Sequence, residues 1–290
     1  MTIQPALFSK VLRDRSLEEA AELTAEIGYD GFEPMCREPH LDVDRTTDEV
    51  TALGERLDDL GLEVPCLATY TGNYAEKSES ECEAELEELE TFFEFARILD
   101  CDVVRHDPGG PSIRTATDDD IERASAWYAR AADRAAEYGL TLVIEIHARR
   151  LCETVASTER VLEAIDRENV GVIHDAGNMF LVGEDFGADS VRRLGDDLVH
   201  VHVKDERRVD DPDAAGAFQL ETDDGLETFQ PRRLGEGAVD HAPLFDALAE
   251  SGYDGSVTAE CHVPQNEPGD DVAVAAHELE QLTQLITDAN

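Results

Sequence analysis

Lysine is nearly absent from this 290-residue chain, and positive charge of any kind is scarce. Only three of the 24 basic residues are lysines (Lys10, Lys77 and Lys204), whereas 67 residues are acidic, so the formal net charge is −43. A protein of this charge repels polyanions. The composition therefore argues against nucleic acid and anionic membranes as partners.

The acidic residues are spread along the whole chain and are not gathered into a tail. A disordered acidic chain would lack the regular apolar periodicity that is seen here. We therefore interpret the acidity as a surface property that keeps a folded protein hydrated in concentrated salt, where screening suppresses self-repulsion. In this respect the composition resembles that of proteins from extreme halophiles. A rare lysine inside a valine-rich run, Lys204, is for the same reason a candidate functional residue.

Long hydrophobic runs and paired cysteines are also missing. Hydrophobic residues make up 41% of the chain, yet no apolar run approaches the roughly 18–20 residues that a membrane-spanning helix needs. The N-terminal residues lack the pattern of a signal peptide, so we expect a cytoplasmic protein without a membrane partner. The six cysteines are scattered without a CxxC pair, which argues against a disulfide framework or a cysteine zinc site and predicts buried thiols.

Strand-like apolar runs alternate with amphipathic helical runs along the whole chain, giving eight strands and about eight helices. Strict alternation predicts an α/β fold with a parallel sheet closed as a (β/α)8 TIM barrel. Because no linker interrupts the pattern, residues 1–290 are predicted to form a single domain, with residues 206–237 as a long polar loop. The predicted strands cover residues 3–8, 32–34, 63–68, 102–105, 141–146, 170–173, 198–204 and 256–260.

The stretch from Leu198 to Glu206 indicates where a functional site is expected. Apolar residues alternate there with His200, His202 and Lys204, and on a strand these three side chains share one face. In α/β barrels the active site lies at the carboxyl ends of the strands, so polar residues there are functional candidates. Other predicted strands end in similar residues, namely Glu33, His106, Asp107, Glu145, His147, His174, Asp175, Glu260 and His262.

Four consecutive strands would bring a Glu, an Asp, a His and a Glu to one axis of such a barrel. Three carboxylates and one imidazole suit a divalent Mn²⁺, Mg²⁺, Co²⁺ or Zn²⁺ ion. Without a cation this grouping would be costly, because like charges raise one another's pKa. The alternative is that each acid is a polar residue on the rim of a loop, which accounts for one such position more easily than for four in register.

The chain also carries six short motifs in a fixed order: GYDGFE (28–33), VIEIH (143–147), HDAGN (174–178), VHVKD (201–205), LGEGAVD (234–240) and VTAEC (257–261). Together they resemble the xylose isomerase-like superfamily of TIM barrels, the sugar phosphate isomerase/epimerase group. That group includes ketose 3-epimerases, inosose dehydratases and isomerases, and the DNA-repair endonuclease IV. The resemblance spans nearly the whole chain, and the ordered set is specific although each motif alone is weak.

The resemblance implies one divalent metal ion, held by Glu145, Asp175, His202 and Glu260. It selects His202 because the ligand in similar chains stands two residues before the Lys-Asp pair, which leaves His200 as a supporting or core histidine. In the isomerase and epimerase relatives two glutamates flank the substrate and move protons at adjacent carbons, while the metal stabilises a cis-enediolate. The resemblance therefore implies Glu145 and Glu260 as the acid/base pair.

Further candidates are residues that could contact the substrate. His147 and Lys204 stand where they could hydrogen-bond substrate oxygens or stabilise the enediolate. His106, Glu33 and Arg149 are additional candidates for substrate contact, although Arg149 could equally be a surface arginine.

The implied function is that of a metal-dependent isomerase or epimerase of a sugar, sugar acid or sugar phosphate. The expected partner is a small-molecule sugar, and relatives of this kind are often homodimers or homotetramers. Two alternatives use the same barrel: an inosose-type dehydratase on the same metal site, and a non-catalytic sugar- or metal-binding protein, against which the complete ligand set argues. A nuclease of the endonuclease IV type is disfavoured by the charge and by Asn178, which stands where those relatives keep an extra metal-binding histidine.

Low ionic strength is expected to destabilise the folded protein. The Debye length grows from about 3 Å at 1 M salt to about 30 Å at 0.01 M, so dilution exposes the acidic surface to its own repulsion. We expect the melting temperature, followed by circular dichroism, to fall as the salt is diluted from molar to millimolar concentration. Full thermal stability in dilute buffer would contradict the interpretation of the acidic surface.

Overall fold

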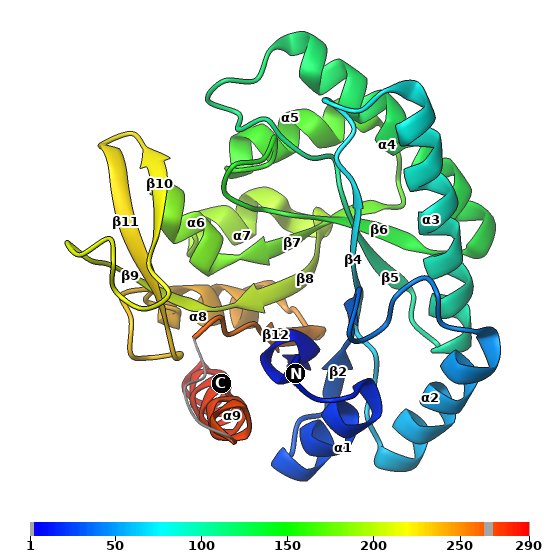
Figure 1. Cartoon of the computed structure of the whole chain (residues 1–290). Coiled ribbons are helices and arrows are strands. Elements are labelled where there is room, and N and C mark those ends of the chain that lie inside the picture. Colours follow the sequence, from blue (N-terminus) through cyan, green and yellow to red (C-terminus); the bar gives the residue numbers. More distant parts are fainter. Residues whose placement is uncertain (1–2, 264–268, 290) are drawn as a thin grey trace.

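A nearly closed barrel of parallel strands lies at the centre of the protein in the computed structural model, which describes residues 3–263 and 269–289 (Figure 1). Its described strands pair in the order β2-β1-β12-β8-β7-β6-β5-β4-β3. Helices surround this sheet, which confirms the predicted TIM barrel. The barrel strands are β1 (Gln4–Phe8), β2 (Gly31–Glu33), β3 (Met35–Cys36), β4 (Leu67–Gly72), β5 (Val103–Asp107), β6 (Thr141–Glu145), β7 (Val170–Asp175), β8 (Leu198–Val203) and β12 (Ser256–Ala259).

The second strand of the barrel is interrupted, and the interruption brings the two ends of the sheet together. β2 pairs with β1, whereas β3 pairs with β4 at the opposite end of the strand order. Pro34 separates β2 from β3, and its carbonyl accepts a hydrogen bond from Ala68 N at 3.3 Å. Because proline has no N–H to donate to a ladder, the strand changes partner there. β2 and β3 therefore correspond to one of the eight predicted strands.

The helices begin where the sequence provides N-caps, and α2, α3 and α4 each start with a complete capping box. At α1 only half of such a box is formed, because Ser16 accepts from Glu19 N while the Glu19 carboxylate pairs with Arg15. The helices are η1 (Ser9–Leu12), α1 (Leu17–Ile27), α2 (Thr47–Leu60), α3 (Glu79–Ile98), α4 (Asp118–Tyr138), α5 (Val155–Ile165), α6 (Ala176–Val182), α7 (Ala188–Leu194), η2 (Gly195–Asp197), α8 (Ala242–Ser251) and α9 (Asp270–Asp288).

The predicted polar loop at residues 206–237 is wrong, because this segment forms most of a second sheet. β9 (Asp205–Arg208), β10 (Phe218–Thr222) and β11 (Gly225–Arg232) are antiparallel, in the order β10-β11-β9. Leu220 and Phe229 are buried on one face of this sheet and pack with Leu181 and Val182 of α6. Figure 1 shows the sheet beside α6, at the end of the barrel where β8 finishes. The sheet therefore forms a wall next to the expected site.

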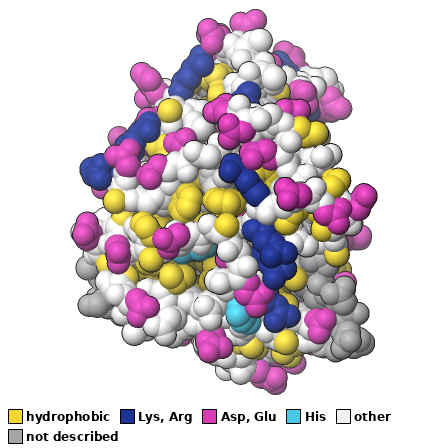
Figure 2. Space-filling view, turned by 90° about the vertical axis from the view of Figure 1, so that its left-hand side faces the viewer, with side chains coloured by type: hydrophobic (Ala, Val, Ile, Leu, Met, Phe, Trp, Pro, Cys, Tyr) yellow, Lys and Arg dark blue, Asp and Glu magenta, His cyan; other side chains and the backbone are white. Residues whose placement is uncertain are grey.

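Buried cysteines and a dispersed acidic surface agree with the sequence analysis. All six cysteines are buried and free. On the face that carries β9, β10 and β11, Figure 2 shows acidic side chains scattered among other types and not gathered into one patch. In the described ranges, 3–263 and 269–289, none of the helices combines the length and apolar character needed to cross a membrane.

The Asp205 carboxylate fixes the loop that follows the second sheet. It accepts hydrogen bonds from the backbone N–H groups of Gly235 and Gly237 at 2.9 Å and of Val239 at 3.0 Å. A Cβ atom at residue 237 would lie 2.0 Å from Asp205 Oδ1, so only glycine fits at this position. The LGEGAVD motif is thus a backbone cradle around one buried carboxylate.

Replacing Asp205 with alanine is expected to destabilise the protein by roughly 2–4 kcal/mol, because N–H groups that now bind a charged acceptor would lose it. The free energy of unfolding can be measured with urea in high salt. Asp210→Ala is a suitable control, because Asp210 is exposed. A similar loss of stability in the two variants would show that the cradle contributes little.

Candidate active site

Four predicted metal ligands lie together at the carboxyl ends of adjacent barrel strands. Glu145 ends β6, Asp175 ends β7, His202 lies on β8 and Glu260 directly follows β12. One ligand atom from each of these buried residues lies within 4.8 Å of the others. The strand register places these residues at a similar height along the barrel axis. Asp175 pairs with His202 across β7 and β8, and His202 pairs with Thr258 across β8 and β12.

His202 is oriented so that one ring nitrogen faces the three carboxylates. Its Nε2 forms a hydrogen bond of 2.9 Å with Glu33 Oε1. Its Nδ1 is buried, has no hydrogen-bond partner in the described chain, and lies 3.7 Å from Glu260 Oε2 and 3.8 Å from Glu145 Oε1. Burial opposes protonation of His202, but the surrounding carboxylates raise its pKa well above the usual value, so the ring of the metal-free protein is charged. A metal ion would displace the Nδ1 proton and bind that nitrogen, while Nε2–H still donates to Glu33. This donor set fits a divalent cation.

Glu33 lies beneath this group, fully buried, and binds both histidines of β8. Its second oxygen is 2.9 Å from His200 Nε2, which also lies 3.1 Å from Thr258 Oγ1. Burial alone would raise the pKa of Glu33, but the charges and hydrogen bonds of His202 and His200 lower it well below its usual value. Glu33 thus orients both histidines from below. Its substrate contact and the supporting role of His200 stay predictions.

Lys204 compensates the carboxylate charge at the centre of the site. Its Nζ lies 2.8 Å from Asp175 Oδ2, 2.9 Å from Glu260 Oε2 and 3.8 Å from Glu145 Oε1. Burial by itself lowers the pKa of Lys204, but the surrounding carboxylates raise it well above its usual value, so the ammonium stays charged. Gly177 of α6 makes room for this side chain, because a Cβ atom there would lie 2.4 Å from Lys204 Cγ.

Arg105 of β5 was not among the predicted site residues, although it binds Glu145 directly. Its Nη1 lies 2.7 Å from Glu145 Oε2, and its Nε donates to Thr69 O. The other Glu145 oxygen accepts from Asn178 Nδ2 at 3.1 Å. Burial opposes ionisation of Glu145, but Arg105 is the largest of the influences that hold its pKa well below the usual value. The available sequence signal was an arginine following two valines in a strand.

His106 is fully buried and lies away from the predicted ligands. Thr71 Oγ1 is 2.8 Å from its Nδ1 and Tyr74 Oη is 2.7 Å from its Nε2. Burial lowers the pKa of His106 to about 3, so the ring is neutral. Both ring nitrogens lie within hydrogen-bond distance of protein hydroxyls, and the substrate contact of His106 stays a prediction.

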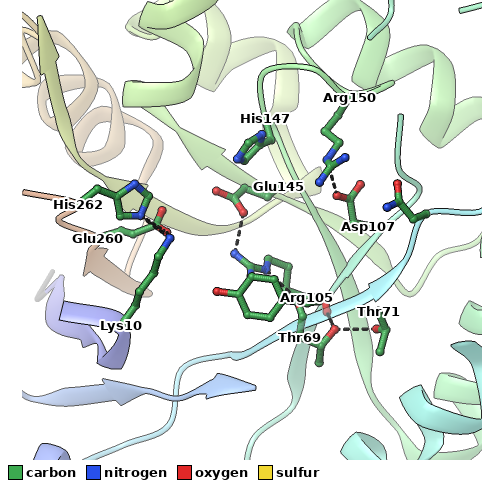
Figure 3. A pocket seen from close by; sticks show the side chains of 12 residues that line it. Lys10, Thr69, Thr71, Arg105, Asp107, Glu145, His147, Arg150, Glu260 and His262 are labelled. Atoms are coloured by element: carbon green, nitrogen blue, oxygen red, sulfur yellow. Dashed lines mark hydrogen bonds and ion pairs between the residues drawn. The ribbon is translucent and has the colours of Figure 1, made fainter. Parts of the chain in front are cut away.

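A pocket of about 120 Å³ opens above Glu145 and Glu260 (Figure 3). His147 lines it, together with two residues that the sequence analysis did not assign, Lys10 and His262. Lys10 Nζ is 2.7 Å from His262 Nε2, which in turn is 2.9 Å from Glu260 Oε1. Figure 3 shows these side chains beside Glu260, with Arg105 reaching Glu145 from below. Basic side chains thus surround both candidate proton carriers.

A second pocket of about 160 Å³ lies between this centre and the β9-β10-β11 sheet. His147 and His262 line both pockets, and Lys204 lines the second. Arg149 also lines the second pocket, and its guanidinium donates a hydrogen bond to Gln219 O of β10. The structure therefore places Arg149 at the outer wall of the site and not at the metal ligands.

Comparisons with known proteins agree with this geometry. A family model described as "Xylose isomerase-like TIM barrel" matches residues 21–285. The inosose dehydratase of Lacticaseibacillus casei is 32% identical over 144 residues, 50% of this chain and 48% of that protein. Over such matches the chain spans about half the length of the first curated relatives. The inosose dehydratase of Geobacillus kaustophilus (strain HTA426) is 26% identical over 269 residues, 88% of this chain and 82% of that protein.

Solved structures share the fold over nearly the full length. The IolI protein, solved with a bound zinc atom, has a TM-score of 0.80 at 16% identity and covers 99% of both chains. L-ribulose 3-epimerase has a TM-score of 0.77 at 22% identity and covers 99% of this chain and 96% of its own. At this identity the likeness concerns the fold.

The two histidines of β8 are expected to respond differently to replacement by alanine. His202→Ala should weaken binding of added Mn²⁺ by more than the roughly 10–100-fold loss typical of a residue that only orients a ligand. His200→Ala should stay within or below that range and mainly lower the melting temperature, because it removes a buried partner of Glu33. Metal titration followed by elemental analysis measures the first effect. The reverse order of metal affinities would exchange the two assignments.

Proposed function

This chain belongs to the xylose isomerase-like TIM barrel family, and from that premise we propose that it is a divalent-metal-dependent isomerase or epimerase of a small polyhydroxylated carbonyl compound. The substrate class includes sugars, sugar acids and sugar phosphates. The observation that carries the proposal is the pair of buried carboxylates, Glu145 and Glu260, next to the unpartnered Nδ1 of His202.

The metal would be held by Glu145, Asp175, His202 and Glu260, whose donor atoms suit Mn²⁺, Mg²⁺, Co²⁺ or Zn²⁺. When bound, such an ion polarises the carbonyl and hydroxyl oxygens of a substrate, which acidifies the neighbouring C–H group. The three carboxylates and the imidazole lie at the centre of the barrel, and Glu33 would hold that imidazole in one tautomer from below. The ion would therefore be bound deep in the barrel.

Glu145 and Glu260 are the proton carriers in this proposal. Burial opposes ionisation of both, but the adjacent cations, Arg105 at Glu145 and Lys204 at Glu260, hold their pKa values well below the usual range. Each carboxylate is therefore ionised and able to accept a proton from carbon. One takes the proton and the other returns a proton to the opposite face of the same carbon or to the adjacent carbon.

His147 and Lys204 would hold the oxygens of the substrate. His147 Nδ1 lies 2.7 Å from the carbonyl oxygen of Ala148 and donates its proton there, so the other ring nitrogen can accept a hydrogen bond from a substrate hydroxyl. Burial lowers the pKa of His147, which keeps the ring neutral. The Lys204 ammonium can donate to an oxygen that gains negative charge when the C–H bond breaks.

A dehydratase of the inosose type is the second candidate, because the curated relatives at 26–32% identity include several inosose dehydratases. It requires the same proton abstraction next to a carbonyl, followed by loss of a neighbouring hydroxyl group as water. A nuclease is disfavoured, since Asn178 uses its amide to hold Glu145 and the net charge of −43 repels DNA. A merely binding barrel does not account for two ionised carboxylates that each pair with a cation.

Glu145→Gln and Glu260→Gln should each lower turnover by about 10²–10⁴-fold, the usual contribution of a positioned acid or base. The metal-loaded protein can be incubated in D₂O and high salt with a panel of keto-sugars, keto-sugar acids and inososes, and C–H exchange followed by NMR. A product that differs from the substrate in mass only by the deuterium gained at carbon indicates an isomerase or epimerase, whereas loss of one water indicates a dehydratase.

Each variant needs a metal titration, because both residues are also expected ligands, and rates should be compared at saturating metal. Glu55→Gln, at an exposed position of α2, is a control for the substitution itself. Undiminished exchange in both site variants would disprove the assignment of the proton carriers.

A further inference from the structure

The second pocket contains an acid that the proposed proton transfer does not use. Glu206 lies on β9 and lines this pocket together with Lys204. The two residues are two apart on an extended segment, so their side chains point to the same side. Asp205, between them, points to the opposite side and binds the loop at Gly235 and Gly237. Strand geometry thus directs Glu206 to the side on which Lys204 contacts the predicted metal ligands.

Glu206 is buried, and one oxygen of its carboxyl group lacks a partner among the described residues. The residue is 2% exposed, and its Oε2 is fully enclosed without a hydrogen-bond partner in the described parts of the chain. A buried acid that lacks a partner stays neutral more readily than it ionises. Because Glu206 lines the pocket and this oxygen has no competing partner among the described residues, a turn of the carboxyl group would present it to a ligand.

The surroundings favour the protonated form of this carboxyl. Leu181, Phe218 and Leu220 supply apolar surface to the pocket wall. Burial is the largest cause that raises the pKa of Glu206 to about 8; three nearby carboxylates add to the effect and Lys204 opposes it. At neutral pH the group carries a proton that it can donate. The charged groups near enough to influence it are Lys204, Asp175 and Glu260 on the side of the site, and Asp205 on the opposite side of the strand.

The other titratable groups of the site are less suited to donate a proton on this side. Glu145 and Glu260 are held ionised by adjacent cations, and His147 is neutral with Nδ1 bound to a carbonyl. Lys204 directs its ammonium to Asp175 and Glu260. A substrate whose carbonyl lies at the four predicted ligands and whose carbon chain or ring extends past His147 would place a hydroxyl group beside Glu206.

We propose that Glu206 is the proton donor to a hydroxyl group β to the substrate carbonyl, so that the site eliminates water. The inference rests on the proposed function, because it requires proton abstraction next to a carbonyl. It then favours the second candidate, the dehydratase, over the isomerase or epimerase, because water is lost where those enzymes would return the proton. The substrate class is a polyhydroxylated ketone that carries a hydroxyl group β to its carbonyl.

The elimination is balanced without an oxidant or reductant. Glu145 or Glu260 removes the proton from the carbon next to the carbonyl, and the C–H electron pair forms an enolate. Its collapse forms a C=C bond and breaks the C–O bond at the β carbon. The leaving oxygen takes the proton of Glu206 and departs as water. Glu206, now a carboxylate, regains a proton from solvent, and the base releases its proton to solvent when the product leaves.

The decisive variant is Glu206→Gln, tested with an inosose in D₂O on the metal-loaded protein. Water elimination, followed by the mass of the product, should fall by about 10²–10⁴-fold. The recovered substrate should still acquire deuterium next to its carbonyl, because both candidate bases remain. The rate of this exchange should lie within a few-fold of the rate at which the unaltered protein abstracts the proton. Metal affinity should be unchanged. A merely structural residue would lower exchange and elimination together.

Glu278→Gln is the matched control, because Glu278 is also a fully buried acid with an enclosed, unpartnered Oε2 among the described residues, and it is absent from the lining of both pockets. It should leave the ratio of elimination to exchange unaltered. Glu206→Asp keeps a carboxyl on a shorter side chain and should retain more elimination than Glu206→Gln. It also provides a test if the amide variant fails to fold.

The outcomes separate this inference from the proposed function. Elimination that survives in Glu206→Gln, or that falls in step with exchange, overturns the role of Glu206. Exchange without elimination by the unaltered protein across the whole panel also overturns it, but leaves the proposed isomerase or epimerase intact. Absence of both exchange and elimination rejects the proposed function and this inference with it.

Discussion

Charge neutralisation in the barrel centre is the constraint on which the site depends. Glu33 and the three carboxylate ligands are buried within one barrel, where unpaired charges are costly. The protein supplies Lys204 and Arg105 as fixed cations and His202 as a hydrogen-bond partner. The arrangement still leaves His202 Nδ1 unpartnered in the described chain. A divalent cation would complete the compensation and satisfy that nitrogen, so the electrostatic balance and the proposed chemistry require the same ion.

The barrel and the four ligand candidates follow from the sequence because they depend on periodicity and on residue order. How deep a side chain lies in the barrel cannot be predicted in the same way. Glu33 and His106 both stand near strand ends, yet Glu33 lies beneath the candidate ligands and His106 lies between two hydroxyls. The break at Pro34 and the local register of the strands set these directions. The β9-β11 sheet was missed although FQLET alternates apolar and polar residues; its apolar face becomes evident only when α6 packs against it.

The two pockets differ in chemistry, and the difference divides the tasks of the site. The first places basic side chains such as Lys10 and Arg105 around the two ionised carboxylates. The second combines Glu206 with the apolar side chains of the added sheet. His147 and His262 form the boundary between them. In the proposed function proton abstraction is the task of the barrel itself, and in the further inference the sheet added after β8 selects the step that follows. Such a division would let one barrel support several reactions.

The three lysines show how an acidic surface coexists with this centre. Their side chains are 4% (Lys204), 22% (Lys10) and 27% (Lys77) exposed, so each is largely withdrawn from solvent. Lys204 and Lys10 contact Glu260, while Lys77 pairs with Glu85 and donates to Gly72 O at the end of β4. A compact ammonium with three donors can serve several oxygens at once, which the planar guanidinium of arginine cannot reproduce. The three lysines thus lie where one ammonium contacts more than one polar atom, and the acidic residues of the exposed surface are separate from the charge balance of the site.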